Sequence, residues 1–281
     1  MSDKTASDAT TRTTAARVAA PHRMARDGFA AKAIATIPYV ISFAALFLTW
    51  HLASVYVVKS VLFPSPITVF GKGAQLMANG TLLEHIVASL KRIAAGFVLG
   101  SAIGIPIGLA IGSFKAARRL IEPWTEFLRF IPAVAMITIA VIWFGIGEEA
   151  KVFLIIYTTV FIVILNTAAG VASIAPNKLR VAQALGANKL QLFTLVALPA
   201  TVPFILTGMR LAMANSFTTI VAAEFVSAES GLGVLLWNGR LFMLVDEIFV
   251  ALVTLGILGF TADRIFRVGI YRFARRYSPV A

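Results

Sequence analysis

The 281-residue sequence contains no cysteine, which excludes disulfide bonds, thiolate metal sites and thiol chemistry. Its three histidines, His22, His51 and His85, are too few and too widely separated to predict a histidine-based metal site or an acid–base centre. Charged residues make up just 14% of the chain, whereas hydrophobic residues make up 59%. Soluble domains are typically about 45–50% apolar. The composition therefore predicts a membrane protein rather than a soluble enzyme.

The first part of the chain, residues 1–32, is rich in Ser, Thr, Ala and Arg and has few large apolar side chains. Such a segment buries too little apolar surface to offset the entropy of ordering, so we expect a disordered tail. The apolar run that follows is too long for the core of a signal peptide and predicts an uncleaved first span. We expect a transmembrane domain over 33–276 and a short C-terminal tail over 277–281.

Long apolar segments predict a membrane bundle of about six helices. A spanning helix needs about 20 mostly apolar residues, and the third segment is short, at 17 residues with Pro132 near its start. The expected fold is all-α and polytopic. The predicted spans cover residues 34–58, 86–112, 130–146, 152–172, 204–226 and 248–265.

The distribution of basic residues predicts the orientation of these spans. The net charge of +12 would suggest nucleic-acid binding in a soluble protein, but here Lys and Arg cluster between the apolar runs. With the N-terminus inside, 18 basic residues lie in cytoplasmic segments and 6 in external ones. Because cytoplasmic loops carry the excess of Lys and Arg, both termini are predicted to be cytoplasmic.

Glycine recurs at every fourth position of the second predicted span. Residues four apart form one ridge of a helix, so this ridge has no side chains. Small residues let helices approach closely in membranes, and we therefore assign the ridge to helix packing. Its members are Gly96, Gly100, Gly104, Gly108 and Gly112.

The segment between the fourth and fifth spans, residues 173–203, predicts two short helices on the cytoplasmic side. Pro176 suits the first turn of a helix, and Gly186 can end it in a left-handed conformation. A second helix would carry Leu190 and Phe193 and end before Pro199. An apolar face with small residues favours docking into a groove of a partner protein. The alternative is an amphipathic segment lying on lipid headgroups.

Polar side chains within spans are costly and mark candidate pathway residues. Thr and Ser have the lowest free-energy cost in a span, because their hydroxyl groups also form hydrogen bonds to their own helix. For Glu224 the alternatives are an ion pair with a basic residue or a place at the outer vestibule. Arg210, near a span end, is expected to extend its charge to the membrane surface. The candidate pathway residues are Thr159, Asn166, Asn215, Thr219 and Glu224.

The segment after the fourth span resembles the EAA motif of ATP-binding-cassette (ABC) importer permeases. That motif has Glu-Ala-Ala, a following Gly, and Ile-x-Leu-Pro after nine more residues. Here the glutamate position holds Arg180, whereas the last alanine, the glycine and the Leu-Pro pair are retained. The resemblance implies a coupling helix that contacts an ATPase. The implied coupling residues are Arg180, Val181, Ala182, Gly186, Ala187, Val196, Leu198 and Pro199.

Further motifs are similar to the nitrate, sulfonate, taurine and bicarbonate branch of these permeases. They are FPSP at 63–66, ASLKRIAAGF at 88–97, WFGIGEEAK at 143–151, LNTAAGV at 165–171 and VAAEF at 221–225. The resemblance implies a permease in the bacterial inner membrane that transports a small anionic solute. It also implies a second copy of the permease, an external solute-binding protein and a cytoplasmic ATPase dimer. Membrane lipid is expected around the chain, and nucleic acid is not an expected partner.

The sequence contains no phosphate-binding loop of its own. That loop requires G-x-x-x-x-G-K-[ST], and the nearest segment, Gly71–Gly73, lacks the spacing. We therefore expect no enzymatic activity and no bound cofactor in this chain, with ATP and Mg²⁺ used by the partner. The alternative is an ion-coupled secondary transporter. It predicts carboxylates at mid-span and two similar halves, and neither is evident.

Overall fold

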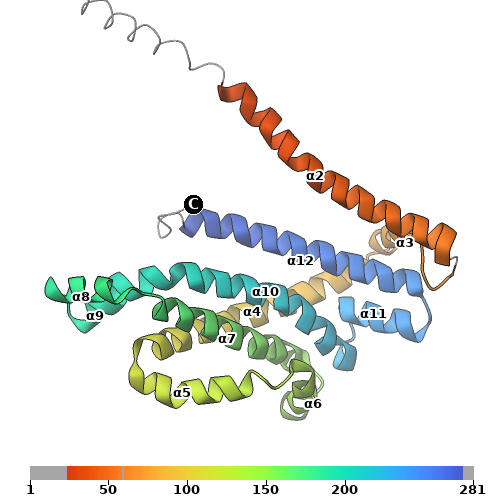
Figure 1. Ribbon diagram of the computed structural model, residues 1–281. Coiled ribbons are helices and arrows are strands. Elements are labelled where there is room, and N and C mark those ends of the chain that lie inside the picture. The colour runs from red at the N-terminus through yellow and green to blue at the C-terminus, as the bar shows by residue number, and fades with distance from the viewer. Residues whose placement is uncertain (1–23, 59, 275–281) are drawn as a thin grey trace, which may run out of the picture. The chain divides into compact units, whose positions relative to one another are not determined.

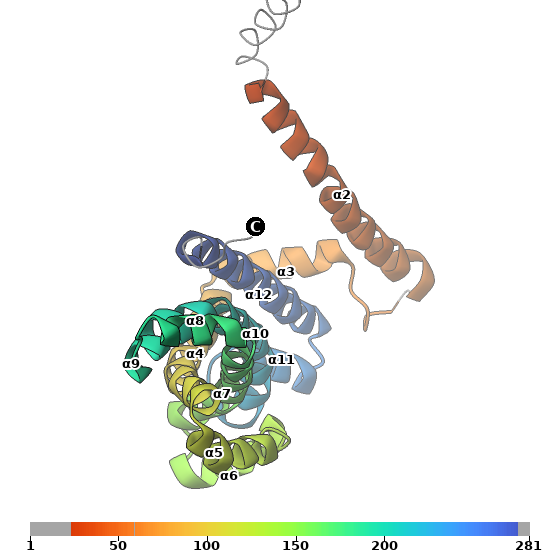
Figure 2. The same ribbon diagram turned by 60° about the vertical axis from the view of Figure 1, so that its left-hand side comes forward.

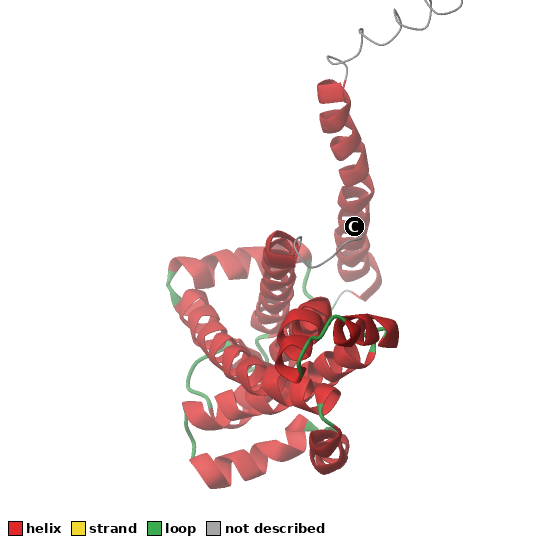
Figure 3. Cartoon of the chain, turned by 90° about the vertical axis from the view of Figure 1, so that its left-hand side faces the viewer, coloured by secondary structure: helices red, strands yellow, loops and turns green. Residues whose placement is uncertain are grey.

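The computed structural model describes residues 24–58 and 60–274. Over these residues the secondary structure is helical and no strand is present (Figure 3). The chain divides into two compact units, one ending at Pro66 and one beginning at Ile67. Helix α2 begins at Met24, before the expected end of the N-terminal tail. Residues 1–23 of that tail, and the C-terminal tail at 277–281, lie outside the described residues.

The N-terminal unit contains one long helix. Helix α2 (Met24–Leu52) continues into a π-helical turn, η2 (Ala53–Val58). The indole Nε1 of Trp50 donates a hydrogen bond of 3.1 Å to the carbonyl oxygen of Pro64, which holds the following turn against the helix. Residues Ile37–Val58 are long and apolar enough to cross a membrane. A helix that is apolar on all sides is typical of a lipid-surrounded span.

The C-terminal unit is a bundle in which α4, α7 and α10 pack together. Figures 1 and 2 show these three helices side by side, with α12 on one flank and α5 and α6 on another. Helices α8 and α9 lie at one end of the unit, and α6 and α11 lie at the other (Figure 1). The elements are α3 (Pro66–Ala78), α4 (Thr81–Ser113), α5 (Lys115–Leu128), α6 (Ala133–Phe144), α7 (Glu148–Ala172), α8 (Pro176–Ala184), α9 (Lys189–Gln191), η3 (Leu192–Ala197), α10 (Leu198–Ser227), α11 (Leu232–Leu241) and α12 (Val245–Ala274).

The predicted all-α membrane bundle is confirmed. Among the described residues, five helical segments are long and apolar enough to cross a membrane, or six if one bent pair counts as a span. The core between α4, α6, α7 and α10 is apolar, and Ile155 and Ile220 at its centre are fully buried.

The third predicted span, 130–146, contains one short helix, α6. Helix α5 ends before this range begins, and it meets α6 at an angle of 100°. Helix α6 has 12 residues, about 18 Å at 1.5 Å per residue, whereas the hydrocarbon core is about 30 Å thick. The break falls before Pro132, which lacks an N–H and restricts the residue that precedes it.

The carbonyl groups freed at this break are satisfied by α7. The hydroxyl group of Tyr157 donates to the carbonyl oxygen of Leu128 at 2.6 Å, and that of Ile131 lies 3.2 Å away. Irregular backbone at membrane depth is tolerated only where other groups satisfy it. Tyr157 therefore stabilises a bend that would be costly in lipid.

The glycine ridge of α4 lies directly against α7. A Cβ atom added at Gly100 would lie 2.7 Å from the Cβ of Thr159, and one at Gly108 would lie 2.6 Å from the Cβ of Thr167. The other three glycines meet Ile155, Val163 and Val171 at similar distances. Real Cβ atoms do not approach this closely, so the ridge sets the spacing between α4 and α7.

Replacing Gly108 by leucine should destabilise the bundle by about 1–3 kcal/mol or more, the usual cost of overpacking. The added side chain meets both Thr167 and the backbone of Ile164, which cannot move independently. Gly256→Leu is the matched control, since no atom lies within 4 Å of a Cβ there. The thermal midpoint of the purified protein in detergent measures both. Equal midpoints for the two variants would show that α4 and α7 have room to separate.

Candidate coupling and translocation sites

The coupling segment, residues 176–199, begins with a capped helix. Pro176 occupies the first turn of α8, and Gly186 beyond its end has φ = 83°, so the predicted left-handed cap is confirmed. The N–H of Ala187 donates to the carbonyl oxygen of Ala182 at 3.0 Å, and the N–H of Gly186 donates to that of Gln183 at 2.9 Å. This pair of bonds is a Schellman motif. The turn between α8 and α9 is therefore defined by backbone bonds.

The second half of the coupling segment differs from the prediction that a helix ends before Pro199. Helix α9 starts with a capping box between Asn188 and Gln191 and continues through the π-helical turn η3 into α10. Pro199 lies in the first turn of α10, where a proline is tolerated. The wider π-helical turn precedes it and accommodates the altered bonding. As a result α9, η3 and α10 form one continuous path from the coupling segment into a span.

The coupling segment presents two different faces. Val181, Leu185 and Leu190 are exposed by 60%, 83% and 70%, respectively. Leu179 and Gln183, one turn apart on the other side of α8, line a cavity inside the unit. Bulky apolar residues that are exposed together indicate a contact surface. We refer to Val181, Leu185 and Leu190 as the outward face.

The expected coupling residues are spread over the whole segment. Arg180 and Val181 are exposed, and no atom lies within 4 Å of a Cβ at Gly186. The remaining five, Ala182, Ala187, Val196, Leu198 and Pro199, are partly buried. The outward leucines at positions 185 and 190 lie outside the matched motif. The position of Leu185, four residues after Val181, is the signal that could have identified it, whereas Leu190 lies on the next helix, beyond the turn at Gly186.

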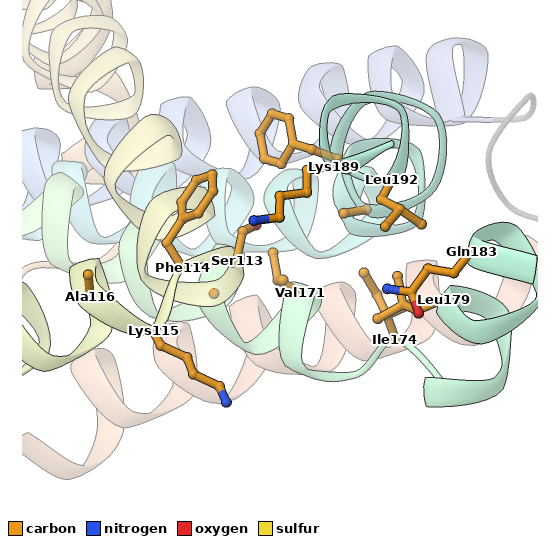
Figure 4. A pocket seen from close by; sticks show the side chains of 13 residues that line it. Ser113, Phe114, Lys115, Ala116, Val171, Ile174, Leu179, Gln183, Lys189 and Leu192 are labelled. Atoms are coloured by element: carbon orange, nitrogen blue, oxygen red, sulfur yellow. The ribbon is translucent and has the colours of Figure 1, made fainter. Parts of the chain in front are cut away.

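A cavity of about 550 Å³ lies behind the coupling segment (Figure 4). It is open on one side and is bounded by the ends of α4 and α7, the start of α5, and the side of α8, α9 and η3 that faces the bundle. The lining residues are Gly112, Ser113, Phe114, Lys115, Ala116, Val171, Ile174, Leu179, Gln183, Lys189, Leu192, Phe193 and Ala197.

A second cavity, of about 470 Å³, opens on the bundle beside the α5–α6 break. Arg129, which follows α5, lines it, and its other polar residues come from α7 and α10. The amide nitrogen of Asn215 donates to the hydroxyl oxygen of Thr219 at 3.3 Å, and the hydroxyl oxygens of Thr158 and Thr219 are also 3.3 Å apart. Two of the predicted pathway residues, Asn215 and Thr219, thus share this cavity.

The other three predicted pathway residues lie elsewhere. Thr159 is fully buried against Gly100 in the α4–α7 contact. Asn166 donates to the carbonyl oxygen of Ile162, one turn back on its own helix, at 2.8 Å. Glu224 belongs to a buried ion-pair cluster. Thr158, which lines the cavity in place of its neighbour Thr159, could not be selected without knowing how α7 is rotated.

A cluster of charged side chains joins α4, α7 and α10; Arg92, Lys151 and Glu224 are buried in it, and Glu148 is 59% exposed. The guanidinium group of Arg92 forms a bidentate pair with Glu148, at 2.5 and 2.8 Å, and a further bond of 2.7 Å with Glu224. The ammonium group of Lys151 lies 3.0 Å from Glu148. The side chain of Glu224 is 0% exposed and that of Arg92 is 6% exposed. Of the two alternatives for Glu224, the structure therefore shows the ion pair.

The same cluster holds the loop between α10 and α11. The hydroxyl group of Ser89 donates to Glu224 at 2.8 Å and accepts from the N–H of Leu232 at 2.8 Å. The N–H of Gly233 donates to the other carboxylate oxygen of Glu224, also at 2.8 Å. Arg92 donates to the carbonyl oxygen of Ser230 at 2.5 Å. The carboxylate of Glu224 is thus saturated by donors, as a buried charge requires.

Arg210, expected to extend its charge to the membrane surface, has a side chain that is 40% exposed. Its guanidinium group pairs with Asp263 of α12 at 2.5 and 3.0 Å. This bidentate pair ties α10 to α12.

Comparison with known proteins identifies the family. The model of the family described as "binding-protein-dependent transport system inner membrane component" matches residues 100–278. The chain is 39% identical to a "probable ABC transporter permease protein" of Brucella melitensis over 84% of this chain and 95% of that protein. It is 34% identical to the taurine transport system permease protein of Escherichia coli, over 82% of this chain and 84% of that protein.

A solved structure shows the same fold. The inward-facing MetNI methionine ABC transporter matches with a TM-score of 0.59 at 20% identity, covering 67% of this chain and 95% of that one. The bundle therefore has the fold of that transporter's chain. The chain is a member of the binding-protein-dependent transport system inner membrane components, the permease subunits of ABC importers.

Proposed function

We propose that this permease imports a small anionic solute and that a separate ATPase drives it through the coupling segment. The observation that carries the coupling role is the outward face, where Val181, Leu185 and Leu190 are exposed on a segment with defined caps. Amphipathic helices dock by such faces into grooves of partner proteins. The continuous path from α9 through η3 into α10 would pass movement of the partner to a span.

The proposed assembly contains more than this chain. Two copies of the permease would form the pathway, a cytoplasmic ATPase dimer would bind the two coupling segments, and an external binding protein would deliver the solute. The chain itself would catalyse no reaction and hold no cofactor, because ATP and Mg²⁺ would be used by the ATPase. The excess of basic residues on the side of the coupling segment supports cytoplasmic termini in a bacterial inner membrane.

Asn215, Thr219 and Thr158 are the pathway residues that the geometry favours. They bring an amide donor and two hydroxyl groups into one cavity, which Arg129 also lines and where its charge would attract an anion. Such neutral donors bind the oxygens of an anion without holding it as tightly as a charge would. A sulfonate fits this description, and the similarity to a taurine permease supports it.

Uptake by the complete transporter tests the solute class. Vesicles containing this permease with its ATPase and binding protein would be given ATP and radiolabelled taurine, an alkanesulfonate or nitrate. ATP-dependent accumulation of one of these anions supports the proposal. Accumulation that continues without ATP and follows an ion gradient would instead support a secondary transporter. If a neutral or cationic solute alone is accumulated, the anionic class is wrong.

Thr219→Val should lower uptake about 5- to 10-fold, the effect of losing one hydrogen bond to the solute of about 1–1.5 kcal/mol. The substitution keeps the shape of the side chain and removes the hydroxyl group that contacts Asn215 and Thr158. Thr207→Val is the control: both hydroxyl groups also bond to the carbonyl oxygen one turn back on α10, but Thr207 does not line the cavity. Initial uptake rates at subsaturating solute measure both. Equal rates for the two variants would place the pathway elsewhere.

A further inference from the structure

The cavity behind the coupling segment has an amphipathic lining. Its walls are formed by aliphatic and aromatic side chains from four elements, including Val171, Ile174 and Phe193. Among the described residues that line it, two are lysines, Lys115 and Lys189, and none is acidic. An apolar space with a cationic margin matches a ligand that has an apolar part and a negatively charged part.

A polar group with no protein partner also lies in this lining. The hydroxyl oxygen of Ser113 is buried and has no hydrogen-bond partner among the described residues. In Figure 4 the side chain of Lys189 extends across the cavity toward Ser113. Buried hydroxyl groups are normally paired. An oxygen acceptor in the cavity would satisfy both this hydroxyl group and the lysine.

The cavity lies at the ends of two helices that can cross a membrane. Helix α4 ends at Ser113 and α7 ends at Ala172, and both helices are long and apolar enough to cross a membrane. Basic pockets between helices at this depth bind the phosphate groups of anionic lipids. A phospholipid at this position can place its phosphate at Lys189 and Ser113 and its first acyl carbons against the apolar walls, with the charge of Lys115 at the margin of the cavity (Figure 4).

We propose that this cavity binds an anionic phospholipid, held by Lys189 and Ser113 and attracted by the nearby charge of Lys115. The lipid and the ATPase would contact different sides of α8. Leu179 and Gln183 face the cavity, whereas Val181 and Leu185, half a turn away, form the outward face that is free for a protein partner. The lipid would join α8 to the corner between α4 and α5 from the inside.

Such a lipid would have a role in coupling, and that role would not depend on which solute is transported. It would fill the space between this segment and the bundle, so that movement of α8 is transmitted to α4 and α7. The proposal concerns the inner face alone. It can therefore fail while the coupling role of the outward face stands, and the reverse is also true.

Native mass spectrometry of the purified chain in detergent tests the binding. The probes are phosphatidylglycerol and phosphatidylcholine, added separately at equal concentration. Each lysine near an anionic group contributes about fivefold in affinity. We therefore expect phosphatidylglycerol to bind in preference, about fivefold more weakly to Lys189→Gln and about 25-fold more weakly to Lys115→Gln/Lys189→Gln. Lys178→Gln, an exposed lysine of α8 outside the cavity, should bind as the unmodified chain does.

Two results would overturn the proposal. One is equal binding of the two lipids, and the other is equal binding of phosphatidylglycerol by the double variant and by Lys178→Gln. A variant that fills the cavity, Leu192→Trp, provides an independent check and should exclude phosphatidylglycerol while the chain remains monodisperse. Retained binding by that variant would place the lipid at another site.

Cysteine labelling separates the lipid from a protein occupant. Because the chain has no cysteine, Leu179→Cys and Leu185→Cys each introduce a single thiol. We expect phosphatidylglycerol to slow maleimide labelling at position 179 and to leave position 185 unchanged, whereas added ATPase should protect position 185. Protection of position 179 by the ATPase in lipid-free detergent, with none by phosphatidylglycerol, would assign the cavity to the ATPase instead.

Discussion

Leu185→Glu should uncouple ATP hydrolysis from uptake. Leu185 is 83% exposed on the outward face, with Val181 one turn before it and Leu190 on the next helix. A charge placed at the centre of an apolar contact must be desolvated without a partner, and such central residues cost about 2 kcal/mol or more when they are lost. Solute accumulated per ATP hydrolysed in reconstituted vesicles should therefore fall by at least about 10-fold.

Asn177→Glu is the matched control for this prediction. It adds the same charge to the same helix, in its exposed first turn, where an acidic residue favours the helix. We expect it to couple normally. If Leu185→Glu also couples normally, the outward face is not the ATPase contact. If both variants lose coupling, the added charge acts on the segment as a whole and the apolar face is not the cause.

Gly186 is a less direct test of the same contact. Its φ of 83° strains any substituent with a side chain, although no atom lies within 4 Å of a Cβ there. A Gly186→Trp variant therefore combines backbone strain with a blocked surface. Asparagine adopts this conformation more readily than other residues, and Gly186→Asn separates the two effects.

The helices with a strong apolar pattern could be predicted from the sequence, because burial in lipid or in the bundle imposes that pattern on nearby residues. The glycine ridge of α4 and the cap at Gly186 belong to the same class, since each depends on local spacing. Arg180, in place of the motif's glutamate, is exposed in the structure. Its helix forms without that glutamate.

The third span and the end of the coupling segment could not be predicted in the same way. The break between α5 and α6 depends on Tyr157, which donates to carbonyl groups 26 and 29 residues before it. The continuous path past Pro199 depends on a π-helical turn, which has no clear signature in the apolar pattern. Both features arise from bonds that local spacing does not encode.

The site residues show the same division. Asn215 and Thr219, one turn apart on one helix, share a cavity as their spacing suggests. Thr159 and Glu224 do not line that cavity, because each side chain faces α4. Packing against α4 sets the rotation of α7 and α10, and local spacing does not reveal it. The partners of Arg92 lie 56 and 132 residues away in sequence. One sequence cannot identify such pairs.

Arg92→Leu should prevent assembly of a stable bundle. The substitution leaves the carboxylate of Glu224 fully buried without its cation, and it removes the bidentate partner of Glu148. Breaking a buried pair by removing one partner costs about 3–5 kcal/mol, because the remaining charge is uncompensated. The loop at Ser230 also loses its bond to Arg92. We expect a sharp fall in the yield of monodisperse protein and in its thermal midpoint in detergent.

Three further variants identify the cause of this loss. Glu224→Gln keeps an oxygen that can accept from Ser89 and Gly233 and should cost less than Arg92→Leu. The double variant Arg92→Leu/Glu224→Leu removes both charges and should recover part of the stability, since well-packed apolar pairs can replace buried ions. Arg129→Leu is the control, because the side chains of Arg129 and its partner Glu126 are 33% and 45% exposed and such surface ion pairs contribute little to stability.

Equal losses for Arg92→Leu and Arg129→Leu would show that the buried cluster does not hold α4, α7 and α10 together. A double variant less stable than Arg92→Leu alone would instead assign the effect to the size of the side chains rather than to their charge.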